Sequence, residues 1–204
     1  MACRVCMGKR SSFSRVADDF YPTPLAAVLP LLPHLSRIKI FAEPCAGDGS
    51  LVRHLASYCR CVHASDVRPK GPKIAKLDAF HLRNAAADCF ITNPPWDRAI
   101  LHPLIDHLRV LLPTWLLIDA DWMHTKQAAP HLRYCRKIVS VGRVKWIADS
   151  PYSGKDNCCW YLFGKVATPT TFVGPACAPS AATLSPSACR LGGADRGARA
   201  IRAK

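Results

Sequence analysis

The sequence lacks a long apolar segment. Its longest apolar stretch, residues 24–35, is interrupted by Pro30 and Pro33 and falls short of the roughly 20 residues that a membrane-spanning helix needs. The first ten residues, MACRVCMGKR, contain no apolar core of the kind found in a secretory signal. We therefore expect neither a membrane span nor secretion.

The sequence also lacks the usual metal and phosphate motifs. Cys3 and Cys6 form a CxxC pair without a second such pair, no HExxH occurs, and no GxxxxGK[ST] loop is present. The eleven cysteines are an odd number, which favours free thiols in a reducing compartment over a disulfide framework. We expect no metal site.

Acidic residues are scarce. The chain has 14 Asp and Glu against 28 Lys and Arg, which gives a net charge of +14 and favours a polyanionic partner. Its 204 residues, half of them hydrophobic, suffice for one domain with tails. We interpret residues 1–17 as a basic arm, 18–165 as the folded domain, and 166–204 as a disordered basic tail rich in Ala, Pro and Ser.

Short apolar runs alternate with helical patterns along the domain. Helices are expected after Ser50, which can cap its helix, and after residue 97, where apolar residues recur at helical spacing. This alternation predicts an α/β fold with a mostly parallel, doubly wound sheet, in which ligands bind beyond the carboxyl ends of the strands. The expected strands are residues 38–42, 61–64, 74–77, 89–92, 115–118, 138–141 and 158–163.

The first expected strand ends in the sequence EPCAGDGS. Gly47 and Gly49 allow a tight turn and a close approach of the backbone to a ligand. Glu43 and Asp48 make the turn a poor cradle for pyrophosphate and a better one for a cationic ligand that carries an amine and a sulfonium. A plain strand-to-helix turn is the alternative interpretation.

Two further acidic residues close the next expected strands. Asp66 lies 23 positions after Glu43, close to the spacing at which an acid accepts hydrogen bonds from ribose hydroxyls in nucleoside-binding α/β folds. Asp78 closes the third expected strand, where an acceptor can meet an adenine amino group. Each alone is typical of a solvated loop, but the series indicates a nucleoside site.

The fourth expected strand ends in the most specific motif, Asn93-Pro94-Pro95-Trp96. Two successive prolines remove two N–H donors and stiffen the backbone. The Asn93 amide oxygen and the nearby carbonyl groups can then accept both N–H groups of a planar amine and direct its lone pair at an electrophile. Trp96 offers a flat face on which a base can stack.

Together these motifs resemble those of S-adenosylmethionine-dependent adenine-N6 DNA methyltransferases, in particular the small phage and prophage enzymes. The resemblance covers about residues 18–165 and includes Tyr21-Pro22-Thr23-Pro24 and a late segment from Gly142 to Phe163. It implies a Rossmann-like methyltransferase fold of about seven strands with the last inserted antiparallel, and a location in the cytoplasm of a bacterial or phage-infected cell. By the same resemblance, cofactor-binding roles fall to Tyr21, Thr23, Pro24, Glu43, Cys45, Gly47, Gly49, Asp66 and Asp78, and the flipped adenine is held by Asn93, Pro94, Pro95 and Trp96.

Cations and aromatic residues of the late segment are expected to bind DNA. They are Arg143, Lys145, Trp146, Tyr152 and Lys155, and either Trp146 or Tyr152 is expected to stack on the target base. The chain has no separate target-recognition domain of ordinary size, which implies little sequence specificity. Alternative substrates are cytosine N4 and a protein glutamine amide, and a catalytically inactive nucleic-acid-binding relative is a further alternative.

Overall fold

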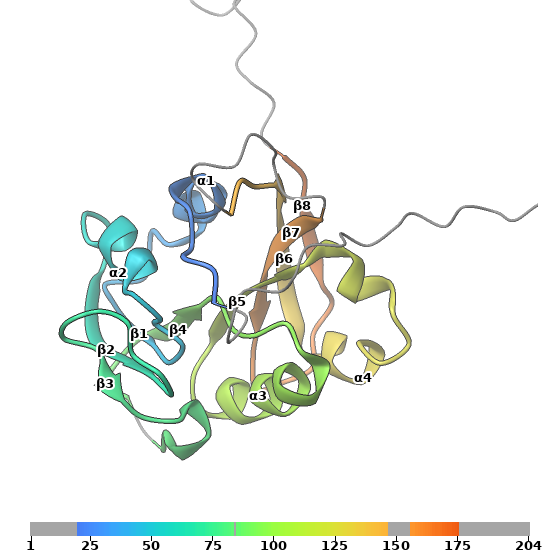
Figure 1. The fold of residues 1–204 in the computed structure, drawn as a ribbon. Helices are drawn as coiled ribbons and strands as arrows, with labels where there is room; N and C mark the ends of the chain where they lie inside the picture. The colour runs from blue at the N-terminus through green and yellow to red at the C-terminus, as the bar shows by residue number, and fades with distance from the viewer. Residues whose placement is uncertain (1–19, 84, 147–155, 176–204) are drawn as a thin grey trace, which may run out of the picture.

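The fold is built around one sheet of eight strands, seen in a computed structural model that describes residues 20–83, 85–146 and 156–175 (Figure 1). The strands lie in the order β3-β2-β1-β4-β5-β7-β6-β8. Their bounds are β1 (Ile40–Glu43), β2 (Arg60–Asp66), β3 (Ala75–Lys76), β4 (Cys89–Thr92), β5 (Thr114–Asp119), β6 (Cys135–Arg143), β7 (Asn157–Phe163) and β8 (Thr171–Val173).

The sheet is parallel except for one strand. β1 to β5 pair in parallel, β7 lies antiparallel between β5 and β6, and β8 pairs in parallel with the outer side of β6. An antiparallel strand inserted at this place in an otherwise parallel sheet is the arrangement that the resemblance implied. The predicted α/β, Rossmann-like methyltransferase fold is confirmed.

Helices cover both faces of the sheet (Figure 1). Alternate residues of the central strands belong to opposite core layers. On one face, α1 (Leu25–Val28), η2 (Leu29–His34) and α2 (Ser50–Leu55) pack against Phe41, Ile91 and Trp160. On the other face, α3 (Arg98–Leu111) packs against Phe90, Leu116 and Tyr161. The remaining short helices are η3 (Ala79–His81), η4 (Ala120–His124) and α4 (Ala129–Leu132).

The two helices predicted from sequence are present, but one begins differently. The side chain of Asp97 caps α3 by accepting from the N–H of Ala99. Four residues of the predicted apolar stripe are buried (Leu101, Leu104, Ile105 and Leu108), whereas the fifth, Ile100, is exposed. The prediction that Ser50 caps α2 is wrong. Gly49 occupies the cap position, and the Asp48 carboxylate accepts the N–H of Ser50, the first residue of the helix.

The expected start of the tail at residue 166 is also wrong for its first residues. Thr171–Val173 form β8, which extends the sheet beyond β6. The strand has only three residues and Phe172 remains 58% exposed, so no buried apolar run marks it in the sequence. Residues 1–19 and 176–204 lie outside the described residues. Within the described ranges, no helix is long and apolar enough to cross a membrane.

Candidate functional site

The predicted site residues converge at the carboxyl edge of the sheet. β1 pairs with β2 on one side and with β4 on the other, so Glu43, Asp66 and Asn93 follow or end three neighbouring strands. Asp78 follows β3, the next strand beyond β2. The sheet therefore brings together the acids and the amide that the sequence places up to 50 residues apart.

The glycine turn, residues 44–49, requires its two glycines. Gly47 and Gly49 have φ of 54° and 79°, a region that side chains with a Cβ rarely adopt. A Cβ on Gly47 would lie 2.6 Å from Cε2 of Phe20, so the aromatic ring rests directly on the turn. The turn is held by hydrogen bonds from the Gly47 N–H to Asp66 and from the Lys70 N–H to the Gly47 carbonyl, both at 2.8 Å.

Glu43 is a buried acid with an unused oxygen. Its side chain is 1% exposed and its Oε2 has no hydrogen-bond partner among the described residues. Burial, with the negative charges of Asp48 and Asp66, raises the pKa of Glu43 well above its ordinary value. A buried acceptor without a partner is costly, and a cationic N–H donor would satisfy both its hydrogen bond and its charge.

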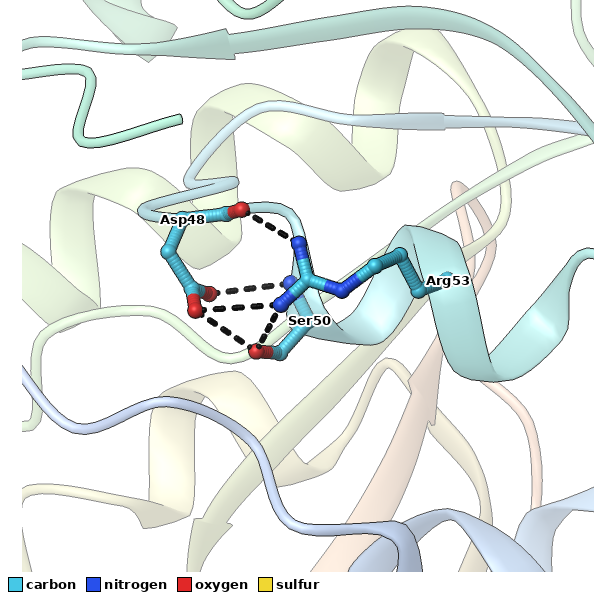
Figure 2. A network of polar contacts seen from close by, with 3 residues as sticks. All are labelled: Asp48, Ser50 and Arg53. Carbon is cyan, nitrogen blue, oxygen red and sulfur yellow. Dashed lines mark hydrogen bonds and ion pairs between the residues drawn. The ribbon is translucent and has the colours of Figure 1, made fainter. Parts of the chain in front are cut away.

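Asp48 differs from Glu43 because its charge is already paired (Figure 2). Its carboxylate accepts from the N–H and the hydroxyl of Ser50, and from Arg53, whose guanidinium also reaches the Asp48 carbonyl at 2.7 Å. Burial opposes ionisation, but these hydrogen bonds outweigh it and lower the pKa of Asp48. The sequence interpretation counted two negative groups at this turn. Among the described residues, Asp48 has an ion-pair partner in Arg53, and Glu43 has none.

Asp66 and Asp78 both hold backbone N–H groups. Asp66 accepts from Gly47 and Arg68, each at 2.8 Å, and Asp78 accepts from Phe80 at 3.0 Å. A carboxylate has about four acceptor positions, so these bonds leave capacity for a ligand.

Cys45 lies among these acids. Burial, together with the charges of Asp66, Glu43 and Asp78, raises the pKa of the Cys45 thiol to about 12. The thiol therefore stays protonated at neutral pH and is a poor nucleophile. All seven cysteines of the described ranges are free. In the same ranges, no three His, Cys, Asp or Glu side chains gather as metal ligands would.

The proline bracket, residues 93–96, follows β4 directly. Pro94 is buried, and Asn93 donates from its amide nitrogen to the hydroxyl oxygen of Thr23 at 3.3 Å. Thr23 is 6% exposed. The structure thus places the predicted Tyr21–Pro24 motif in contact with the predicted bracket, although Thr23 and Asn93 are 70 residues apart in the sequence.

Three aromatic residues gather beside the bracket. The Trp96 indole donates to the Leu117 carbonyl of β5 at 2.9 Å, which fixes the ring. Trp146 meets Trp96 at a centroid separation of 5.7 Å and an angle of 86°, and meets Tyr21 at 6.4 Å. Because all three side chains are only partly buried, the cluster keeps aromatic surface accessible.

The predicted DNA-binding residues are only partly described. Arg143 ends β6 and Lys145 lies two residues beyond it, directly before Trp146, and both cations are exposed. Tyr152 and Lys155 lie outside the described residues. Arg133 precedes β6 and Arg136 is its second residue, so Arg136 lies roughly 23 Å along the strand from Arg143, at about 3.3 Å per residue.

Sequence reasoning missed two residues at the glycine turn. Phe20 packs on Gly47, and the Lys70 ammonium lies 4.5 Å from the centroid of the Phe20 ring. Phe20 directly precedes the Tyr21–Pro24 motif, so a wider reading of that motif could have included it.

A cavity of about 300 Å³ lies beside the glycine turn. It opens between α2 and the connection from β2 to β3, where Val52 and Ile74 give it an apolar lining. Of the predicted cofactor-binding residues it reaches only Gly49. Its lining is Asp48, Gly49, Val52, Arg53, Ala64, Pro72, Lys73 and Ile74.

Comparison with known proteins is informative about the fold. No family model matches the sequence, and no curated protein is similar to it. A candidate hemolysin of Lactococcus lactis superposes with a TM-score of 0.50 at 9% identity, over 74% of this chain and 91% of that one. A candidate RNA methyltransferase of Pyrococcus horikoshii gives 0.49 at 18% identity (78% and 92% covered), and a dimethyladenosine transferase of Plasmodium falciparum gives 0.46 at 17% (71% and 63%).

The strand order, with β7 antiparallel between β5 and β6, is the one expected of the Rossmann-like methyltransferase fold. At the carboxyl edge of the sheet, a buried carboxyl group that has no cation partner among the described residues lies beside a stiff backbone segment that presents an amide. The first suits a positively charged ligand, and the second suits an amine.

Proposed function

We propose that this protein transfers a methyl group from S-adenosylmethionine to the exocyclic N6 of adenine in DNA. The observation that carries the proposal is that the proline bracket and Glu43 leave adjacent strands, β4 and β1. An acceptor for an aromatic amine and an acceptor for a cationic ligand are thereby placed side by side.

The residues at the strand ends fit S-adenosylmethionine. The buried Oε2 of Glu43 would accept from its ammonium group, and Gly49 lines the cavity beside the turn. Asp66 and Asp78 would accept from its ribose and its adenine, as acids at these strand ends do in nucleoside-binding folds. When bound, this cofactor supplies a methyl group on a positively charged sulfur.

The bracket would hold the target amine. The Asn93 amide oxygen and the Pro94 carbonyl would accept its two N–H groups, so that the nitrogen lone pair faces the methyl donor. Trp96 and Trp146 would stack on the base, which must leave the duplex at a cost of a few kcal/mol.

DNA is favoured as the substrate by charge. The chain carries +14 in total, and Arg143 and Lys145 follow the strand that leads to Trp146. Tyr152 and Lys155 belong to the same proposed surface. Cations for phosphates beside aromatics for unstacked bases are the combination that a base-flipping enzyme needs.

The test is methyl transfer from labelled S-adenosylmethionine to duplexes with and without adenine, followed by nucleoside chromatography. We expect label in N6-methyladenine, and loss of it in Asn93→Ala with cofactor affinity retained. Gln127→Ala, which removes an exposed amide elsewhere, should keep activity. Label in N4-methylcytosine, or in protein alone, contradicts the adenine assignment, and unchanged turnover of Asn93→Ala contradicts the role of the bracket.

A further inference from the structure

We infer that Thr23 is a positioning residue that sets which way the Asn93 amide faces. A planar amide carries an acceptor on one corner and two donors on the other, and it can serve an amine substrate only through its oxygen. The Asn93 amide nitrogen donates to the Thr23 hydroxyl oxygen at 3.3 Å. That bond occupies the nitrogen and leaves the oxygen for another partner.

The opposite orientation would present N–H groups to the amine. Donor would then face donor, and neither N–H group of the amine would find its acceptor in Asn93. A threonine hydroxyl can accept from the amide nitrogen or donate to the amide oxygen, and in this structure the Thr23 hydroxyl accepts, which is the productive arrangement. Among the described residues, the side-chain hydrogen bond recorded for Asn93 is the one to Thr23.

Both partners are held by prolines. Thr23 lies between Pro22 and Pro24, and Asn93 precedes Pro94. A residue that precedes proline is confined to extended backbone conformations, so neither Thr23 nor Asn93 is free to turn away. The contact joins two stiff segments, which makes it suitable for orienting a side chain rather than merely filling space.

The segment that carries Thr23 is also anchored to the sheet. Pro24 accepts from the N–H of Ala27 at 2.9 Å, and the indole of Trp160 in β7 donates to the Ala27 carbonyl at 2.7 Å. Ala27 and Trp160 are both fully buried. The position of the Thr23 hydroxyl is thus set by the core and not by a mobile surface loop.

This role differs from cofactor contact, which the sequence resemblance implied for Thr23. A residue that contacts the cofactor changes its affinity when it is altered. A residue that orients Asn93 changes the rate of the chemical step at unchanged cofactor affinity. The kinetic consequence rests on the proposed adenine transfer, whereas the contact itself does not.

The kinetic test compares Thr23→Val, which keeps the shape and loses the oxygen, with Thr23→Ser, which keeps the oxygen. We expect Thr23→Val to lower kcat about tenfold with the KM and Kd of S-adenosylmethionine unchanged, and Thr23→Ser to restore kcat to within about twofold. Thr168→Val, an exposed threonine outside the site, should have no effect. A higher Kd for the cofactor at unchanged kcat overturns the inference.

A second measurement needs no activity. In urea unfolding, Thr23→Val and Thr23→Ala should lower the midpoint less in an Asn93→Ala background than in the wild type, because the partner is already gone. Equal lowering in both backgrounds overturns the contact. Wild-type protein that methylates no adenine refutes the proposed function instead, and the unfolding comparison still decides whether Thr23 holds Asn93.

Discussion

Glu43→Gln should stabilise the cofactor-free protein while weakening its cofactor binding. The pKa of the Glu43 carboxyl group is raised by burial and by Asp48 and Asp66. The folded protein then keeps a proton that the unfolded chain has lost, so the free energy of unfolding falls as pH rises from 4.5 to the raised pKa. Glutamine has no proton to lose, and its variant escapes this penalty.

The size of the effect has a ceiling. At pH 7, which is 2.5 pH units above the ordinary value of 4.5, the penalty reaches at most about 3.4 kcal/mol at about 1.4 kcal/mol per unit. The variant should gain stability over the wild type progressively between pH 4.5 and pH 7. Urea unfolding across this range measures the difference, and Asp121→Asn, which alters an exposed acid, is the matched control.

Cofactor binding should respond in the opposite direction. Loss of a charged hydrogen bond costs about 1.5–3 kcal/mol, or roughly 10- to 150-fold in the Kd of S-adenosylmethionine measured by calorimetry. The wild-type affinity should rise with pH through the raised pKa, because only the ionised carboxylate pairs with an ammonium group. A Glu43→Gln variant whose unfolding free energy parallels the wild type at every pH refutes the burial argument, and an unchanged Kd refutes the ligand role.

Two further substitutions test the turn and the aromatic cluster. Gly47→Ala combines a positive φ with a Cβ 2.6 Å from Phe20 and should cost about 1–3 kcal/mol in urea unfolding. Gly142→Ala, with φ of +84° and open space around the Cβ, should cost less, and equal losses contradict the packing of Phe20 on the turn. Trp146→Leu should raise the KM for DNA about 5- to 150-fold, while Trp146→Phe retains a stacking face and cofactor affinity stays constant in both. A Trp146→Leu variant with wild-type KM contradicts the stacking role.

The central strands β1, β4, β5 and β7 were predictable because they are buried on both faces. β4, for example, is buried at every position, so its apolar run stands out in the sequence. β8 is short and exposed and leaves no comparable signal. β3 lies within the expected strand 74–77, although only two exposed residues of that run pair in the sheet. Burial on both faces of the sheet, rather than strand propensity alone, determines which strands can be recognised in the sequence.

The convergence of the candidate site residues was predictable as far as strand ends define it. Glycines, acids and prolines at those ends identify the turn and the bracket, since parallel strands end at one edge. Side-chain pairing is not encoded in such spacing. The neutralisation of Asp48 by Arg53 and the orientation of Asn93 by Thr23 depend on where α2 and the Tyr21–Pro24 segment pack in space.

The distribution of charge also shows that proximity in the sequence does not give proximity in space. Arg133, Arg136, Arg143 and Lys145 lie within 13 residues of sequence and read as one basic cluster. β6 crosses the whole sheet between them, so the first pair lies near the amino edge and the second pair at the carboxyl edge beside Trp146. Under the proposed function, a nucleic acid whose base is held at the proline bracket would meet the second of these two pairs and not the first. Two of these four cations therefore add nothing to the charge beside the bracket, and candidate phosphate contacts follow from position along β6 rather than from composition.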